Sequence, residues 1–426
     1  MILEDCNIFD GRAVVGGSIE IDGNVIGKVG RVEKVGGERV DVKGRLVLPG
    51  LICAHGHAYS AFAFSQKGKS SDFLGALQNF WCPLDQSLDR ETVYWSAVLT
   101  GLSYLRNGVT IIIDHHASPN FLRGSLSTLA KGFREVGIRS CLSYEVTDRY
   151  GERKAEEAIK ENERFIREYG GGEKDESVSA LFGLHASFTL NRETLQRCAD
   201  LAKKLCVGFH LHLAEGKVDA ADAKERFGKS LVEHLKDEGI LNGKTLAAHC
   251  VDLDGVQIKN LGETGARVIT NPRSNANNGV GIMNLEDMVR EGILVGIGND
   301  GLGYDMLEEI KSLQFMQSLR AKKPSVLSLE ILNEVLFSNN SKIASDLFKR
   351  RVGEIKEGAY ADLVIMDSKP YSSSSNLANM DSSMVDSVMV DGKWVIRHKK
   401  FLSDVERYTE KIANALGHMG SGECCR

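Results

Sequence analysis

The chain has 426 residues, of which 42% are hydrophobic, 26% are charged and only 6 are prolines. This composition is typical of a folded globular protein with one large and one smaller domain, and it excludes a disordered or fibrous chain. The 53 basic and 58 acidic residues are interspersed and give a net charge of -5. Because the chain lacks the basic stripe that a phosphate backbone requires, nucleic acid is not expected as a partner.

Cysteine usage and hydropathy favour the cytoplasm. The nine cysteines stand singly, apart from the adjacent pair Cys424 and Cys425, whose role the sequence leaves open. None forms a CxxC motif and their number is odd, which argues against a complete set of disulfides. The first residues, MILEDCNIFDG, carry acids where a signal peptide has basic residues. No apolar run approaches ~20 residues, so no membrane span is expected.

The first fifty residues are expected to form short strands and turns, because SIEIDGNVIGKVG alternates apolar and polar residues around an Asp-Gly turn. Residues 51–350 then alternate between strand and helix patterns. Eight apolar segments in this region are strand candidates: 51–55, 110–115, 140–146, 179–185, 208–213, 245–250, 267–271 and 294–300.

Amphipathic segments follow most of these strands. The clearest spans 89–106, with Asp89 as its N-cap and the Asn107-Gly108 pair as its stop. Eight strand-helix units predict an α/β protein with a TIM (β/α)8 barrel. A doubly wound open sheet is the alternative, and it is disfavoured because no glycine-rich dinucleotide loop follows any of the strands.

Residues 351–400 return to the character of residues 1–50, with ADLVIMD and a second Asp-Gly turn in DSVMVDGKWVIRH. Neither end of the chain has enough strands to bury a face alone. The two ends are therefore predicted to meet in one small β-sandwich domain beside the barrel of residues 51–350. Residues 401–426 are then a C-terminal helix and tail.

The histidines gather at the carboxyl ends of the predicted strands. Eight of the 11 lie at or near such an end: His55, His57, His115, His116, His185, His210, His212 and His249. In a barrel these ends open onto one face, where the chemistry of such enzymes takes place. A single histidine is more often a core or surface residue, but the shared position of eight predicts a site.

Two His-x-His pairs, 55/57 and 210/212, place both rings on one side of a strand, so either pair could chelate a metal. Asp300 ends the eighth strand and adds a carboxylate, although it could instead cap a helix or a turn. Three histidines and one aspartate suit a single divalent ion, with zinc as the default and iron as an alternative that accepts the same donors. The absence of cysteine from this set favours an open catalytic centre.

These stretches carry a family resemblance: LPGLICAHGHAYS, FGLHASFT, HLHLAEG, TLAAHC, ITNPRSNANNGVG, VGIGNDG and KEGAYADLVIMD. The chain resembles the cytosine deaminase and chlorohydrolase (ATZ/TRZ-like) branch of the amidohydrolase superfamily along its whole length. Within that branch IIIDHHASPN is similar to SsnA-type aminohydrolases. Gly56 and Asn299 stand where many relatives have threonine, and these departures bear on the substrate more than on catalysis.

Carried over by position, the resemblance implies that His55, His57, His212 and Asp300 hold one metal ion. Glu215 and His249 are then the acid-base and polarising groups, with Asp300 also taking the proton of the attacking water. The fourth strand ends near His185 rather than at a lysine that could bridge two metals, which makes a two-metal amidase less expected.

The resemblance implies a metal-dependent aminohydrolase that deaminates an amidine-like carbon of a purine- or pyrimidine-like heterocycle by metal-bound hydroxide. One alternative is a hydrolytic dechlorinase or a cyclic amidohydrolase on the same scaffold. Another is a non-catalytic metal- or ligand-binding accessory protein in selenium or heterocycle metabolism. The specific substrate and the oligomeric state stay open, with a homodimer as one option.

Six residues near the mouth of the predicted barrel are candidates for contact with the substrate: His185, His115, His116, Trp81, Arg273 and Asn275. An aromatic ring such as that of Trp81 suits stacking over a flat heterocycle, and Arg273 suits an anionic substituent. For each of the six, packing in the barrel or a place on the surface is the simpler alternative.

Overall fold

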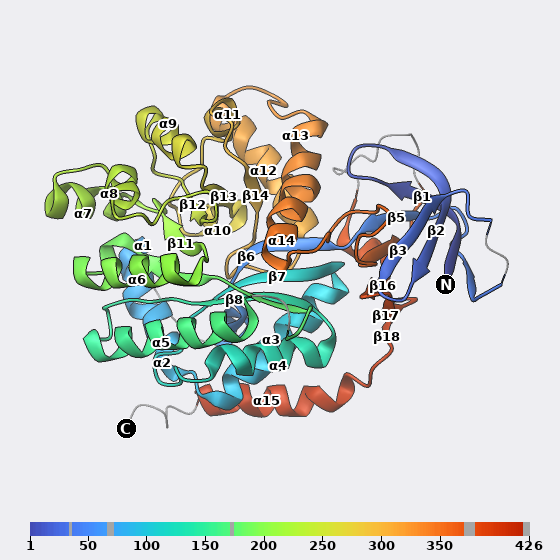
Figure 1. Ribbon diagram of the computed structural model, residues 1–426, viewed down its shortest axis with the longest axis horizontal. Coiled ribbons are helices and arrows are strands. Elements are labelled where there is room, and N and C mark those ends of the chain that lie inside the picture. The colour runs from blue at the N-terminus through green and yellow to red at the C-terminus, as the bar shows by residue number, and fades with distance from the viewer. Residues whose placement is uncertain (34–35, 66–71, 171–173, 370–379, 421–426) are drawn as a thin grey trace.

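The computed structural model describes residues 1–33, 36–65, 72–170, 174–369 and 380–420, so the Cys424 and Cys425 pair lies outside the described residues. The strands form three sheets. One has nine strands drawn from both chain ends, and two parallel sheets of four and five strands come from the segment between. In Figure 1 the parallel strands lie among the helices, and the nine-stranded sheet lies to one side.

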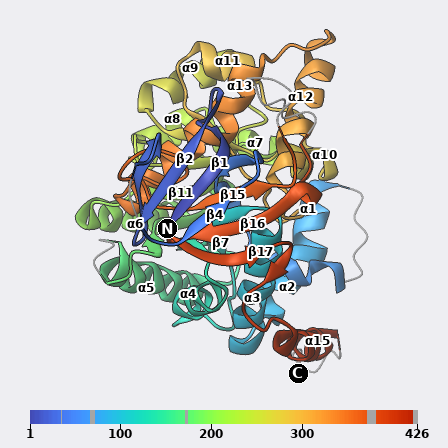
Figure 2. The ribbon, with the colours of Figure 1, turned by 90° about the vertical axis from the view of Figure 1, so that its right-hand side faces the viewer.

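The nine-stranded sheet joins the two ends of the chain, and Figure 2 faces it. Its strands are β1 (Ile2–Phe9), β2 (Val14–Asp22), β3 (Val25–Gly30), β4 (Arg39–Asp41), β5 (Leu46–Pro49), β15 (Leu363–Met366), β16 (Val385–Val390), β17 (Lys393–Arg397) and β18 (Lys400–Phe401). They follow the order β18-β17-β16-β15-β5-β1-β2-β3, with β4 paired to β1. The antiparallel pair β5 and β15, with Leu48 opposite Val364, is where the two ends meet.

The two parallel sheets contain the strands predicted for residues 51–300. The four-stranded sheet is β6 (Leu51–Gly56), β7 (Val109–His116), β8 (Arg139–Tyr144) and β9 (Val178–Ala180), and the five-stranded sheet is β10 (Phe182–Ala186), β11 (Phe209–Leu213), β12 (Leu246–His249), β13 (Arg267–Thr270) and β14 (Val295–Ile297). Only Leu181 separates β9 from β10. Isolated parallel bridges link the two sheets, one from Gly56 of β6 to Asp300 beyond β14 and one from Val146 beyond β8 to Leu184 of β10. The prediction of an α/β protein built on parallel strands is confirmed.

A single residue, Gly50, separates β5 from β6 and so links the nine-stranded sheet to the first parallel strand. A Cβ atom at Gly50 would lie 2.2 Å from Oγ1 of Thr110 on β7, which leaves no room for another residue type. The Gly50 N–H also donates to the backbone carbonyl of Asp362, at 2.8 Å. The two sheets are therefore joined closely at this residue.

Helices connect the parallel strands and cover them. They are α1 (Phe73–Ala76), α2 (Cys82–Ser87), α3 (Arg90–Arg106), α4 (Ser125–Val136), α5 (Glu152–Tyr169), α6 (Arg192–Leu205), α7 (Lys217–Phe227), α8 (Leu231–Asp237), α9 (Gly255–Thr264), α10 (Pro272–Asn277), α11 (Leu285–Arg290), α12 (Met306–Ala321), α13 (Leu329–Asn333), α14 (Asn340–Phe348) and α15 (Glu406–Gly420). Short 3-10 or π turns are η1 (Ala58–Ser65), η2 (Leu77–Trp81), η3 (Ser187–Thr189), η4 (Glu334–Asn339) and η6 (Ser382–Met384).

Helix α3 begins and ends where the sequence predicts. The Asp89 carboxylate accepts from the Thr92 N–H at 2.8 Å, and the Thr92 hydroxyl accepts from the Asp89 N–H at 2.7 Å, which makes a capping box. Asn107 caps the other end, and Gly108 follows with a φ of 78°. Local hydrogen bonding of this kind depends on neighbours in the sequence, so it can be predicted from them.

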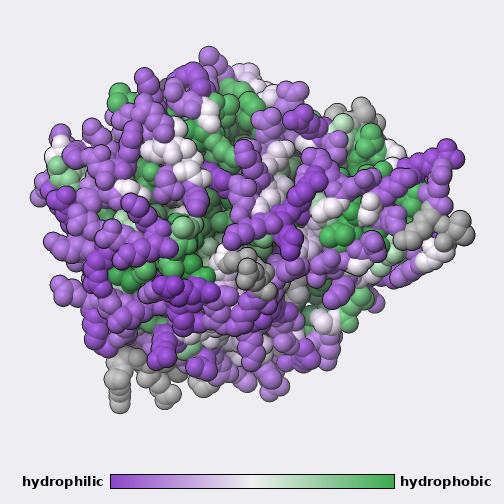
Figure 3. Space-filling model, in the orientation of Figure 1, coloured by the Kyte–Doolittle hydropathy of each residue, from purple (hydrophilic) through white to green (hydrophobic). Residues whose placement is uncertain are grey.

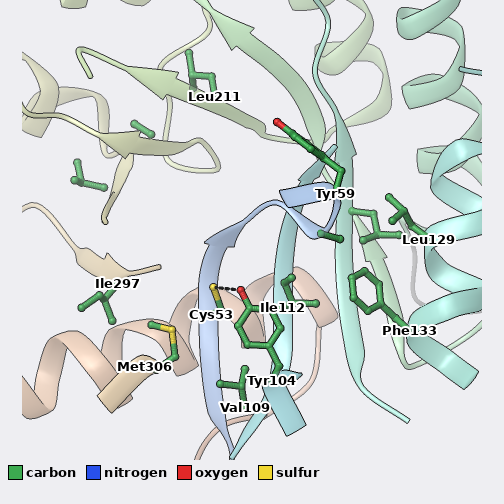
Figure 4. Packing of buried hydrophobic residues seen from close by; sticks show 14 of the residues in the cluster. Cys53, Tyr59, Tyr104, Val109, Ile112, Leu129, Phe133, Leu211, Ile297 and Met306 are labelled. Atoms are coloured by element: carbon green, nitrogen blue, oxygen red, sulfur yellow. Dashed lines mark hydrogen bonds between the residues drawn. The ribbon is translucent and has the colours of Figure 1, made fainter. Parts of the chain in front are cut away.

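The main core packs the parallel strands against their helices. In Figure 4, Cys53 of β6 and Ile112 of β7 lie close to Tyr104 of α3, with Phe133 of α4 nearby. The buried Tyr104 hydroxyl donates to Asn299 Oδ1 at 2.8 Å and lies 3.3 Å from Cys53 Sγ. Asn299, one of the two departures from the family pattern, is therefore held by α3 and directly precedes Asp300.

Hydrophilic residues predominate on the face of the molecule shown in Figure 3, with hydrophobic residues scattered between them. Among the described residues, no helix combines the length and the apolar character that crossing a lipid bilayer demands.

Candidate active site

The four predicted metal ligands lie together at the carboxyl ends of β6 and β11 and just beyond β14. The Nε2 atom of His57 is 2.9 Å from Oδ1 of Asp300 and 3.3 Å from Nε2 of His212. The Nε2 atom of His55 is 3.4 Å from the same Asp300 oxygen. Groups of four drawn from these residues with His115 or His249 place all their ligand atoms within 4.8 Å of one another. Residues far apart in sequence thus converge on one point.

The outer nitrogens of two of these rings are bound by backbone carbonyls. The Nδ1–H of His57 donates to the carbonyl oxygen of His115, and the Nδ1–H of His212 donates to that of His185 at 3.1 Å. A proton fixed on Nδ1 leaves the lone pair of Nε2 pointing inward. Both rings are therefore oriented as metal ligands.

The His-x-His pair 210/212 divides its roles. While His212 faces Asp300, His210 supports His55, because its Nε2 lies 2.8 Å from Nδ1 of His55 and its Nδ1 lies 3.2 Å from the Ser143 hydroxyl. The Nε2 atom of His55 is buried without a hydrogen-bond partner among the described residues. Three imidazole nitrogens and one carboxylate oxygen, with one nitrogen otherwise unsatisfied, fit a single divalent ion.

Asp300 is ionised and oriented for this role. Burial would raise its pKa, but the facing rings of His55 and His57 hold the pKa well below the usual range. Burial likewise opposes a charged ring at His57, yet Asp300 raises the His57 pKa to about 10, so this point attracts positive charge. The Ser274 hydroxyl donates to the second oxygen of Asp300. Helix α12 is capped by Asp305 rather than by Asp300.

The backbone at these strand ends is unusual. Ala214, His249, Cys250 and Asp300 have φ angles of 49°, 75°, 51° and 57°. Non-glycine residues rarely adopt this left-handed conformation, and such residues cluster at functional sites, where the surrounding structure holds them. Two of the four, His249 and Asp300, are predicted catalytic residues.

Glu215 and His249 face each other beside the predicted ligands. The Glu215 Oε2 atom is 3.6 Å from His249 Nε2, and its Oε1 accepts from the Asn278 amide at 3.2 Å. Burial raises the pKa of Glu215. The Nδ1–H of His249 donates to Oδ1 of Asn275 at 2.8 Å, which directs Nε2 toward Glu215. Their separation leaves both groups available to a third molecule.

A cavity opens next to this cluster. It is lined by aromatic side chains and by acidic, basic and amide groups: His57, Tyr59, Phe73, Leu77, Trp81, Asp85, Glu145, Arg149, His185, Ala186, Phe188, His212, Glu215, Asp219, Asn278 and Asp300. The rings of Tyr59 and Trp81 meet edge to face, with centroids 6.4 Å apart. Such walls suit a flat ring bound beside polar groups. Two of the six predicted substrate contacts, Trp81 and His185, belong to this lining.

The other four predicted substrate contacts lie behind the lining. His115 and His116 are fully buried, and Asn275 holds His249. Arg273 lies beside Glu309, with Nη1 3.7 Å from Oε1 of that carboxylate. Direct contact with a substrate stays a prediction for these four residues.

Sequence reasoning missed four charged residues of the lining, namely Asp85, Glu145, Arg149 and Asp219. Burial raises the pKa of Glu145 to about 8 and that of Asp85 to about 6. Glu145 directly follows β8, so its strand-end position was the signal that could have found it. Our prediction used that signal for histidines and overlooked the carboxylate.

Comparisons with known proteins identify the family. Residues 46–395 match the Amidohydrolase family. The chain is 31% identical over 408 residues to a 5'-deoxyadenosine deaminase of Methanocaldococcus jannaschii, covering 92% of this chain and 94% of that protein. It is 28% identical to a 5-methylthioadenosine/S-adenosylhomocysteine deaminase of Caldanaerobacter subterraneus subsp. tengcongensis, over 99% of both chains.

The fold is also similar to a crystal structure of an adenosine deaminase from Xanthomonas campestris with bound zinc, with a TM-score of 0.86 and 19% identity over 99% of this chain and 98% of that one. The resemblance noted in the sequence is confirmed, as is the prediction of a hydrolase that acts on carbon-nitrogen bonds. This chain belongs to the amidohydrolase family.

Proposed function

We propose that this chain deaminates a purine-like heterocycle, with 5'-deoxyadenosine and related adenosine derivatives as the first substrates to test. One observation carries the proposal: the ring nitrogens of His55, His57 and His212 converge with Asp300, and Glu215 stands beside them on the same cavity. The deaminase names of relatives that span the whole chain support the reaction class.

The donor set favours zinc, since it combines imidazole nitrogens with one carboxylate and no thiolate, and ferrous iron is the alternative. The zinc in the similar adenosine deaminase structure supports this choice. A divalent ion held by such a set lowers the pKa of a bound water from about 15.7 to about 7 and so supplies a nucleophile at neutral pH.

Glu215 acts as the proton donor in this proposal. Burial raises its pKa, so the carboxyl keeps its proton closer to neutral pH. Because Asn278 occupies Oε1, Oε2 is the oxygen that can give the proton to a ring nitrogen of the substrate. Protonation of that nitrogen makes the adjacent amino-bearing carbon a better electrophile.

Asp300 and His249 act on the attacking water. Asp300 is ionised, and its Oδ1 can accept the proton that the water loses. His249 is oriented by Asn275, and Nε2 in its protonated form would donate to the oxygen on which charge develops. Return of a proton to the amino group lets ammonia leave.

A pure binding role, such as the accessory protein considered from the sequence, gives no reason for Glu215. A metal or ligand site has no need of a buried carboxyl with raised pKa next to a third metal histidine. Dechlorination or hydrolysis of a ring amide would use the same residues. The product distinguishes these reactions from deamination, since only deamination releases ammonia.

The test is release of ammonia by zinc-loaded protein from a panel of adenosine derivatives, guanine and cytosine, with a chlorinated triazine and a cyclic amide included. Ammonia from at least one aminoheterocycle is expected. Halide release or ring opening without ammonia would contradict the deaminase assignment. Glu215→Gln should keep its zinc and lose at least ~100-fold in turnover, in the range for a positioned acid-base group. The exposed Glu225→Gln on α7 is the matched control.

The finer architecture belongs to the same proposal. The two parallel bridges between the four-stranded and the five-stranded sheet support a closed (β/α)8 barrel over residues 51–350. We further propose a β-sandwich domain from residues 1–50 and 351–400, with residues 401–426 as C-terminal helix and tail. A cytoplasmic location and a homodimer also stay predictions, which cell fractionation and light scattering on the purified protein would test.

A further inference from the structure

A second cavity lies at the amino ends of the parallel strands, away from the candidate active site at their carboxyl ends. It has a volume of about 830 Å³, and none of its described lining residues belongs to the cavity beside the metal ligands. Its wall includes Leu181, which precedes β10, Gly208, which precedes β11, and Arg267, which begins β13. A molecule bound there would take no part in the proposed reaction.

The described lining of this second cavity is strongly basic. It contains five cationic side chains and one carboxylate, that of Asp346, although the whole chain has a net charge of -5. The cationic residues come from the ends of three helices and the approaches to two strands: Arg167 of α5, Lys204 of α6, Lys349 after α14, Lys244 before β12 and Arg267 of β13. A concave surface lined by one sign of charge attracts ligands of the opposite sign.

The two arginines of this set already have acidic partners. A guanidinium nitrogen of Arg167 lies 2.7 Å from a carboxylate oxygen of Glu163, and the Arg267 guanidinium contacts Asp346. The charge of each arginine is therefore balanced within the fold.

The three lysines have no acidic partner within the described parts of the chain. The Lys244 ammonium donates to the backbone carbonyl of Cys206 at 2.9 Å, which is a neutral acceptor and leaves the other N–H groups of the ammonium available. The side chains of Lys204 and Lys349 have neither a hydrogen bond nor an ion pair to any residue that the structure describes. Three ammonium groups thus line this cavity without a carboxylate of their own.

The rest of the lining is mainly apolar. Ile166 and Leu181 are buried at the wall, and Leu205 and Leu347 are partly buried. The Ser179 hydroxyl donates to the backbone carbonyl of Leu347 at 2.7 Å and so holds the end of α14 against β9. The cavity therefore combines a fixed apolar wall with three ammonium groups.

Stabilisation of helix ends explains only part of this positive charge. A lysine in the last turn of a helix interacts favourably with the helix dipole, and both Lys203 and Lys204 occupy that turn of α6. Of these two, Lys204 lines the cavity and Lys203 does not. Lys244 precedes a strand and ends no helix, so its place beside the other lysines has a different cause.

We propose that this second cavity, here called the basic cavity, binds a small organic anion outside the catalytic centre. The anionic group, of the phosphate, sulfonate or carboxylate class, lies at Lys204, Lys244 and Lys349, and the apolar body of the ligand lies against Leu181 and Leu205. Hydrogen bonds from an ammonium group to such an anion are charge-assisted, and the apolar wall removes the body of the ligand from water. The volume of the cavity lies within the range of small-molecule sites, about 300 to 1,000 Å³.

The test compares two probes of similar shape, the anion 2-naphthalenesulfonate and the neutral methyl 2-naphthyl sulfone. Isothermal titration calorimetry on zinc-loaded protein should show the sulfonate binding at least about fivefold more tightly, in the range expected when several exposed ion pairs form. The double variant Lys204→Gln/Lys349→Gln removes two of the charges and should bring the ratio of the two affinities close to one. The matched control Lys203→Gln/Lys342→Gln removes two exposed charges from the same helices outside the cavity lining, so it should leave the ratio unchanged.

The proposal fails if the unaltered protein binds both probes equally, or if the preference for the sulfonate survives in the Lys204→Gln/Lys349→Gln variant. An equal fall of the ratio in the Lys203→Gln/Lys342→Gln control also contradicts it, because the effect then reflects only the net charge of the protein. All four side chains are exposed, so thermal melting should show that both variants fold like the unaltered protein.

Chelation of the zinc separates this inference from the proposed function. None of the predicted metal ligands lines the basic cavity, so the preference for the sulfonate should be the same in metal-free protein. Loss of the preference on chelation would assign the sulfonate to the candidate active site and overturn the proposal. Release of ammonia from a heterocycle, or its absence, bears on the deaminase alone.

Discussion

Two arginines, the buried Arg139 and the partly buried Arg149, lie near the two ends of β8 and differ in how completely they are bonded. Arg139 begins the strand and lies 2% exposed between the parallel strands and the nine-stranded sheet. Its Nε donates to Asp362 at 2.9 Å, its Nη2 to Asp391 at 2.8 Å and its Nη1 to the Glu176 carbonyl at 3.2 Å. All three guanidinium nitrogens are therefore satisfied.

Arg149 follows the other end of β8, where its Nη2 has two carboxylates at 3.8 Å and no close partner. The amino ends of parallel strands hold a fold together, whereas the carboxyl ends carry its chemistry. An arginine whose nitrogens all have hydrogen-bond partners thus serves the fold. An arginine with an unpartnered nitrogen beside the cavity indicates a ligand-binding region. Four predictions test this difference.

The largest effect is expected at Arg139. Arg139→Met leaves Asp362 buried without its partner and should lower the free energy of unfolding by about 3 to 5 kcal/mol. Urea unfolding measures this change, and turnover per folded molecule should stay the same. Arg167→Met on α5, an exposed arginine, should shift stability by no more than about 0.5 kcal/mol. An unchanged free energy of unfolding in Arg139→Met would contradict a structural role for Arg139.

Metal removal should leave the ring nitrogens of His55, His57 and His212 without the ion that they are proposed to bind. Relative to zinc at 100 times its dissociation constant, chelation should lower the free energy of unfolding by about 2.7 kcal/mol. Thermal melting with and without added zinc measures the shift. His212→Ala should abolish most of the difference, and a zinc-independent melting temperature would argue against a resident ion.

Arg149 should affect stability less than Arg139 does. Arg149→Met removes a guanidinium whose Nη2 has no carboxylate closer than 3.8 Å, so it should lower the free energy of unfolding by about 1 kcal/mol or less. Urea unfolding measures this change beside that of Arg139→Met. An equal loss in the two variants would contradict the difference between the two arginines.

The fourth prediction concerns the pH dependence of stability. Burial raises the pKa of Glu309 from 4.5 to about 8, so its protonated form is favoured in the folded state. The stability that it contributes is full below pH 4.5 and is lost as the pH rises through about 8. Glu309→Gln should flatten the dependence of unfolding free energy between pH 5 and pH 8.5. An identical slope in both proteins would show that Glu309 stays ionised.

Local features were the most predictable from sequence. The capping box at Asp89 and the stop at Gly108 depend on neighbouring residues, and both lie where expected. The parallel strands lie within a few residues of the predicted segments, because continuous apolar runs bounded by turns identify buried strands. Strand-end histidines then located the candidate site.

Contacts between distant segments were less predictable. The two-residue period of a strand places His210 and His212 on the same side of β11. In the structure His210 contacts His55, whereas His212 lies among the predicted metal ligands. The direction of Arg273 depends on how α10 packs against α12, which carries Glu309. Asp85 has no spacing signature, and Glu145 was overlooked although it directly follows β8.

Only Gly50 separates the nine-stranded sheet, which is built from both chain ends, from β6, which carries His55. His55 stands five positions beyond Gly50, on a strand with no slack between it and the outer sheet. Any tilt of that sheet must carry β6 with it and alter the angle at which two imidazoles approach their shared point. A partner bound to the nine-stranded sheet would therefore act on the position of His55 through β5, Gly50 and β6.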